Sequence, residues 1–125
     1  RRIWTLPVIT AALLAAGTWV AVQTGEAEED RVEEVVGHDP IHEHEEAGEQ
    51  FRLFATAVFG IALLGLLRGG AGTAARWLTV LGAIAVAVSG TWTAHLGGEL
   101  VYRHGAASAY TDDAAPAELE PTDGD

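Results

Sequence analysis

Three long apolar blocks constrain this chain more than any other feature of its sequence. They run from Ile3 to Val22, from Leu53 to Leu67 and from Trp77 to Leu96, and nearly all of the acidic residues lie between or after them. At 1.5 Å per residue, the first and third blocks each reach about 30 Å, which is the thickness of a hydrocarbon core, and the second block reaches it with its flanks. The pattern predicts three membrane-spanning helices.

A soluble helical bundle is the alternative, because an apolar run of about 15 residues also suits a buried core helix. The first and third blocks have no polar face, however, and a helix at the surface of a soluble bundle would show one. We therefore expect an all-α, polytopic membrane bundle over residues 1–104, with helices over about 3–24, 40–67 and 76–104. Residues 105–125 have little to bury, and we expect a disordered acidic tail.

Arginine residues indicate the direction in which the helices cross the membrane. Arg1 and Arg2 precede the first block, and Arg68 and Arg76 flank the glycine-rich link between the second and third blocks. Short loops that carry arginine stay in the cytoplasm, so the N-terminus is predicted inside and the C-terminus outside. The 18 acidic residues and the net charge of -11 then belong to the outer side, and this charge disfavours nucleic acid as a partner.

Part of the sequence is repeated within the chain. Residues 17–26 and 90–99 read GTWVAVQTGE and GTWTAHLGGE, which are identical at six of ten positions, and the same offset of 73 aligns Trp4 with Trp77. The first and third helices are therefore expected to be copies that run in the same direction. This argues against a cleaved signal peptide, which an Arg-Arg start before an apolar run also suits. A duplicated helical hairpin has four helices, so we expect a four-helix fold whose first helix is not in this chain.

The second helix is predicted to begin outside the membrane. Asp39-Pro40 suits a helix start, with the aspartate as the N-cap acceptor and the proline at the first helical position. A helix from Pro40 would carry its first three turns above the membrane as a collar rich in Glu and His.

Candidate ligands lie at the outer ends of the second and third helices. Counting helix rise from the inner arginines puts Glu49 level with His95, and His44 about 8 Å further out. Imidazole and carboxylate groups ligate transition metals, and two imidazoles ligate a haem. We predict His44 and His95 as ligands of a haem b or of a metal, provided that the second helix tilts, and otherwise a contact of His95 with Glu45 or Glu49. The full predicted set of metal ligands is His42, His44, Glu45, Glu49, His95 and Glu99.

Other interpretations of these residues stay open: they are ordinary polar groups of the membrane interface, or they handle protons. The chain has no cysteine, which excludes disulfides and thiolate metal sites. It also lacks a glycine-rich phosphate loop in a strand-to-helix context and a nucleophile elbow, so no catalytic residue is predicted.

Small side chains line one side of the third helix, where they favour close helix packing. This packing is either inside the bundle or at a dimer interface. The residues are Ala83, Ala87, Gly90, Ala94 and Gly98.

The run HLGGELVYRHG at 95–105, with TGE at 24–26 and HEEAGE at 44–49, resembles the bacterial membrane-protein family catalogued as domain of unknown function 2231. The resemblance covers roughly residues 1–105. It implies four helices, the first with a His-Pro and a further His, and this chain lacks that helix. Some relatives are fused to Rieske or cytochrome c domains, which implies a redox setting in the bacterial cytoplasmic membrane without assigning any residue.

Together these features favour a haem- or metal-binding accessory of an electron-transfer complex. One alternative is a non-catalytic structural subunit of a larger membrane complex, and another is a cation-binding transport or sensing module. The expected partners are the lipid bilayer and either other membrane subunits or further copies of the chain.

Overall fold

The computed structural model describes residues 3–111, and this part of the chain is almost entirely helical. Its long helices are α1 (Thr5–Val36), α2 (His38–Leu64) and α3 (Gly70–Tyr102), followed by the short 3-10 helix η1 (Ala106–Tyr110). All three long helices have the length and the apolar composition of a membrane span. The predicted all-α fold with three such helices is therefore confirmed.

Large apolar side chains cover the outside of the three helices. Leu6 and Leu13 of α1 and Leu81 of α3 are among those that are more than half exposed. Water would penalise this much uncovered apolar surface, whereas lipid tails solvate it. The exposed faces therefore suit a bilayer.

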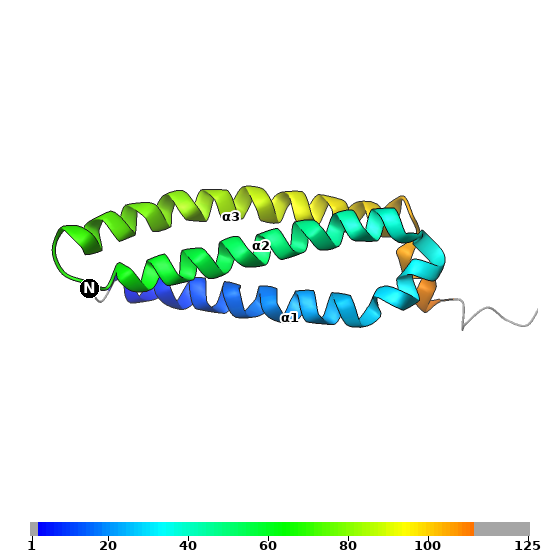
Figure 1. Ribbon diagram of the computed structural model, residues 1–125, viewed down its shortest axis with the longest axis horizontal. Helices are drawn as coiled ribbons and strands as arrows, with labels where there is room; N and C mark the ends of the chain where they lie inside the picture. The colour runs from blue at the N-terminus through cyan, green and yellow to red at the C-terminus, as the bar shows by residue number, and fades with distance from the viewer. Residues whose placement is uncertain (1–2, 112–125) are drawn as a thin grey trace, which may run out of the picture.

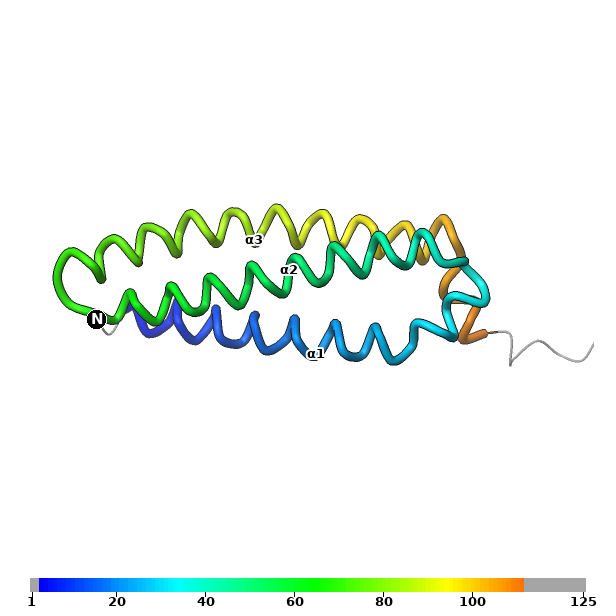
Figure 2. Tube along the Cα trace, viewed as in Figure 1, coloured from blue at the N-terminus to red at the C-terminus, as the bar shows by residue number. Residues whose placement is uncertain are grey.

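Helix α2 lies between the two other helices (Figure 1). It packs against both α1 and α3, which hardly contact each other. Figure 2 shows that α1 and α3 run in the same direction and that α2 returns between them. This confirms the common direction that the internal repeat predicts for the first and third helices.

The helix ends on either side of Gly37 differ from the expected ones. Helix α1 continues to Val36 instead of ending near residue 24, and only Gly37 separates it from α2. Gly37 has a φ of 85°, in the region that favours glycine, and it allows the two helices to meet at a sharp corner. Helix α2 consequently begins at His38, so Asp39 lies within its first turn and is not the N-cap residue.

The connection between α2 and α3, which is predicted to lie on the inner side, is also displaced from its expected position. Helix α2 ends at Leu64 rather than near 67, and α3 begins at Gly70 rather than near 76. The chain therefore turns at Gly65–Gly69. In the sequence this segment lies before the midpoint between Arg68 and Arg76, from which the expected levels of the residues were counted. This displacement changes which residues of α2 and α3 are level with each other.

Glycines and alanines bring the helices close together. A Cβ added at Gly82 would come within 2.6 Å of Val58 Cγ2, and one at Gly90 would come within 2.8 Å of Phe51 Cε2. Ala55 and Ala62 of α2 are almost fully buried. In a bilayer the hydrophobic effect does not hold helices together. Close van der Waals contact of this kind therefore provides much of the attraction between them.

Two tryptophans fasten α1 to α2. The indole Nε1 of Trp4 donates a hydrogen bond to the carbonyl oxygen of Ala62 at 2.9 Å. The indole Nε1 of Trp19 donates to Thr56 Oγ1 at 3.1 Å, and the Arg52 guanidinium lies 4.6 Å from the ring centroid of Trp19. These contacts tie the two helices together at both ends of the apolar region.

The stripe of small residues on α3 lies largely outside the packing within this chain. Ala83, Ala87 and Ala94 are exposed, and only Gly90 and Gly98 are partly buried. Packing inside the described three-helix arrangement therefore does not account for the stripe.

The segment after α3 folds back across the end of the bundle where α1 meets α2, which is predicted to be the outer end. Ala106 joins Ile41 and Leu100 in a small apolar cluster, against which Val32 and Val36 of α1 pack. Tyr110 Oη donates a hydrogen bond to Glu28 Oε2 at 3.0 Å. The expected disorder from residue 105 onward is therefore wrong for 105–111, and its remaining part lies outside the described residues.

Candidate metal centre

The register of α2 against α3 differs from the one counted from the inner arginines. Thr93 Oγ1 donates a hydrogen bond to the carbonyl oxygen of Ala47 at 3.0 Å. The ring of His44 lies against Gly97. His44 is thus only about 3 Å further along α3 than His95, rather than about 8 Å, because the chain turns closer to the N-terminus than the count assumed.

His44 fills the space above Gly97. A Cβ at Gly97 would come within 2.9 Å of His44 Cε1, so glycine is what admits the ring. The Nδ1 atom of His44 is buried and has no hydrogen-bond partner. Such an orphan atom calls for an explanation, and the group of three possible metal ligands found among the described residues does not include His44.

His95 lies on a different side of α3. It is two residues from both Thr93 and Gly97, which face α2, and two residues turn a helix by about 200°. Its side chain is 62% exposed and contacts Trp92 and Glu99 of its own helix. The structure therefore does not direct His44 and His95 toward a common haem or metal within this chain.

Two of the three predicted carboxylate ligands, Glu49 and Glu99, have partners close to them along the chain. Glu99 Oε1 lies 2.9 Å from Arg103 Nη1 and 3.6 Å from His95 Nε2. Glu49 Oε1 lies 3.3 Å from Arg52 Nη2. Glu45 is partly buried and stays a predicted ligand without a described partner.

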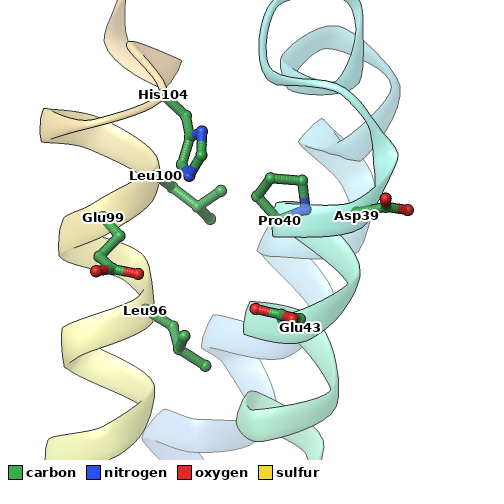
Figure 3. A pocket seen from close by; sticks show the side chains of 7 residues that line it. All are labelled: Asp39, Pro40, Glu43, Leu96, Glu99, Leu100 and His104. Carbon is green, nitrogen blue, oxygen red and sulfur yellow. The ribbon is translucent and has the colours of Figure 1, made fainter.

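A cavity of about 230 Å³ opens between α2 and α3 at their outer ends (Figure 3). Glu43 points toward α3 from its place on α2, Glu99 lies on α3 and the ring of His104 lies above Leu100, whereas the Asp39 carboxylate points away. Because Glu99 is paired with Arg103, the cavity does not provide a set of free ligands. Its lining residues are Asp39, Pro40, Glu43, Leu96, Glu99, Leu100 and His104.

The closest group of possible metal ligands lies at the corner between α1 and α2. One ligand atom each from Glu29, Glu33 and His38 lies within 4.8 Å of the other two. His38 Nδ1 is 3.2 Å from Glu33 Oε1. Ligands about 2 Å from an ion stand roughly 3 to 4 Å apart, so small side-chain rotations bring these three atoms onto one ion.

The corner geometry follows from the helices on either side of Gly37. Glu29 and Glu33 are four residues apart and face the same side of the last turns of α1. His38 opens α2 directly after the corner, where the positive φ of Gly37 redirects the chain. The expected helix bounds of 3–24 and 40–67 leave residues 25–39 outside both helices and therefore do not predict this group, although the i, i+4 spacing of the two glutamates is visible in the sequence.

His42 is the one predicted ligand that lies beside this group. Its ring stacks on that of His38, with centroids 5.7 Å apart and an interplanar angle of 10°. His42 is exposed at the surface, so its imidazole is accessible from outside.

Comparison of the chain with family models, with curated proteins and with solved structures found no match.

Proposed function

We propose that the protein is an integral membrane protein that binds a divalent transition-metal ion at its outer corner and serves as an accessory of a membrane electron-transfer complex. The observation that carries this proposal is the convergence of Glu29, Glu33 and His38 within 4.8 Å. Carboxylates and imidazole are the usual oxygen and nitrogen ligands of Zn²⁺, Co²⁺, Ni²⁺ and Cu²⁺. Two carboxylates also balance the charge of a divalent ion.

A metal ion suits the described residues better than a haem. A bis-histidine haem needs two imidazoles on opposite sides of one plane. His44 and His95 face different directions, and His38 and His42 are stacked side by side. The identity of the bound ion decides the biological role. An ion that changes oxidation state supports electron transfer, whereas Zn²⁺ would give the corner a structural role.

Metal titration of the purified full-length chain in detergent tests the proposal. We expect one Co²⁺ or Zn²⁺ per chain, and we expect His38→Ala and Glu33→Gln each to abolish this binding. His95→Ala is the matched control, because His95 is an outer histidine on another helix and its loss should leave binding unchanged. Binding that survives both corner substitutions, or a wild-type chain that binds no ion, would overturn the proposal.

The second candidate function is a structural subunit, which the exposed Ala83, Ala87 and Ala94 favour. Small residues on an uncovered helix face permit close approach of another membrane helix. A colourless preparation that stays metal-free after incubation with Co²⁺ would favour this alternative.

A further inference from the structure

We propose that His42 is the fourth ligand of the corner site, which makes it a two-histidine, two-carboxylate centre selective for nitrogen-preferring transition metals. This inference rests on the proposed function and specifies its ligand set and metal class. It combines two pairs of side chains that the structure brings to the same corner. They are Glu29 with Glu33 on α1, and His38 with His42 on α2.

Each pair has the spacing of a helical chelate. Residues four apart lie one above the other on a helix face, and two histidines at this spacing bind one metal ion from a single helix. The parallel rings of His38 and His42 show that the two side chains already share one face of α2. Glu29 and Glu33 have the same relation on α1.

Gly37 brings the two chelating pairs together. It is the only residue between α1 and α2, and its φ of 85° is strained for any residue with a side chain. The last turns of α1 and the first turn of α2 therefore meet at a fixed corner. One ligand atom each from Glu29, Glu33 and His38 already lies within 4.8 Å of the other two there. The fourth residue, His42, lies next to this group because its ring stacks on that of His38.

His42 has the freedom to complete the site. Its side chain is exposed, and its described contact is the stacking on His38, so rotation about its side-chain bonds costs little packing. Glu49 and Glu99, by contrast, are held in ion pairs along their own helices. His42 can therefore join the corner group without breaking an ion pair.

Two imidazoles also decide which ions fit. Ca²⁺ and Mg²⁺ take oxygen ligands and gain little from nitrogen, whereas Zn²⁺, Ni²⁺ and Cu²⁺ bind imidazole well. Two carboxylates with a single imidazole, as in the group of Glu29, Glu33 and His38, leave these oxygen-preferring ions more competitive. The second histidine shifts the preference to the transition metals.

The test uses the full chain in detergent with Zn²⁺, Ca²⁺ and Cu²⁺ as probes. Loss of a residue that only supports a metal ligand typically lowers metal affinity by roughly tenfold to hundredfold. We expect His42→Ala, which removes a ligand itself, to weaken Zn²⁺ binding by at least this much. We expect excess Ca²⁺ not to displace Zn²⁺. Pulsed electron paramagnetic resonance of the Cu²⁺-loaded wild-type chain should detect two coordinated imidazoles, and that readout does not depend on how a variant folds. His104→Ala, which removes an outer histidine after α3, is the matched control and should bind Zn²⁺ as the wild type does.

The outcomes separate this inference from the proposed function. If His38→Ala abolishes binding while His42→Ala leaves the Zn²⁺ affinity unchanged and Cu²⁺ shows one imidazole, His42 is not a ligand and the three-residue site stands. If Ca²⁺ displaces Zn²⁺ at equal concentration, the inferred metal selectivity is wrong. If the wild-type chain binds none of the three ions, both proposals fail.

Discussion

At the scale of single residues, equivalent positions of the internal repeat have acquired different roles. Trp4, the residue directly before α1, donates a hydrogen bond to Ala62, and the Arg76 guanidinium lies 5.6 Å from its ring centroid. Trp77, the equivalent residue of α3, is 68% exposed. The same residue type thus fastens a helix in one copy and lies at the membrane-facing surface in the other, where an indole suits the interface between lipid and water.

This difference gives a prediction with a matched control inside the chain. Trp4→Phe removes the hydrogen bond from the indole N–H to the partly buried carbonyl of Ala62. We therefore expect it to lower the free energy of unfolding by about 0.5 to 1.5 kcal/mol. Trp77→Phe removes no such contact and should change it by less than about 0.5 kcal/mol. Thermal or SDS-induced unfolding of both variants in the same detergent, followed by circular dichroism, measures the two values. Equal losses would show that the hydrogen bond to Ala62 contributes nothing.

At the scale of helices, length and hydropathy were sufficient to predict the three spans, because a bilayer requires about 20 apolar residues in each. Length and hydropathy were not sufficient to predict that α1 continues to Val36. The acidic residues around Val32 and Val36 lower the mean hydropathy of this segment. These two valines are four residues apart and pack against the cluster around Ile41 and Leu100. A helix outside the membrane is stabilised by such tertiary contacts, which a reading of one segment at a time does not include.

For the predicted ligands His44 and His95, the sequence indicated their common level along the helix axes but not the sides of the helices on which they lie. The count along the helices placed His44 and His95 at the same outer end, and the structure places them about 3 Å apart along α3. Which face of α3 meets α2 depends on close-packed positions such as Gly90 and Gly97, and one sequence does not say which of several small residues will be used. The group around His38 was missed because it depends on the conformation of a single glycine.

Helix η1 connects the end of α3 to the acidic part of α1, and its contacts with Glu28 and Arg31 are called the latch below. Arg31 Nε donates a hydrogen bond to the carbonyl oxygen of Ala109 at 3.2 Å, and its guanidinium lies 4.8 Å from the ring centroid of Tyr110. The hydrogen bond to Glu28 is the largest of the effects that raise the pKa of Tyr110 above its ordinary value of 10.0. The nearby Arg31 charge acts in the opposite direction.

This raised pKa gives the latch a pH dependence. A group whose pKa is raised by folding stabilises the folded form fully below its ordinary pKa, and that contribution is lost as the pH rises through the raised value. We therefore expect the latch to be intact at neutral pH and to open above about pH 10. In a Tyr102→Phe background, where Tyr110 is the remaining tyrosine, absorbance at the phenolate band measures its titration. Glu28→Gln should lower the pKa of Tyr110 toward 10.0, and an unchanged pKa would show that Tyr110 does not bond to Glu28.

At the scale of the whole molecule, charge and apolar surface are arranged along one axis. The inner end carries Arg68 and Arg76, whereas the outer end carries the acidic parts of α1 and α2. The proposed metal site lies within this acidic end, where the surrounding negative potential concentrates cations near the corner.

The direction of this axis across the membrane is the last prediction. Because short arginine-bearing loops stay in the cytoplasm, we expect the Gly65–Gly69 connection inside and the α1–α2 corner outside. The chain contains no cysteine, so single cysteines report without a background. Ala71→Cys lies at the inner end of α3 and Glu46→Cys at the outer end of α2, and both positions are exposed. A membrane-impermeant maleimide applied to intact cells should label the Glu46 variant, and should label the Ala71 variant only after the membrane is permeabilised. The reverse pattern would place the acidic corner in the cytoplasm, where it would meet a different pool of metal ions, and labelling of both variants in intact cells would mean that the chain inserts in both directions.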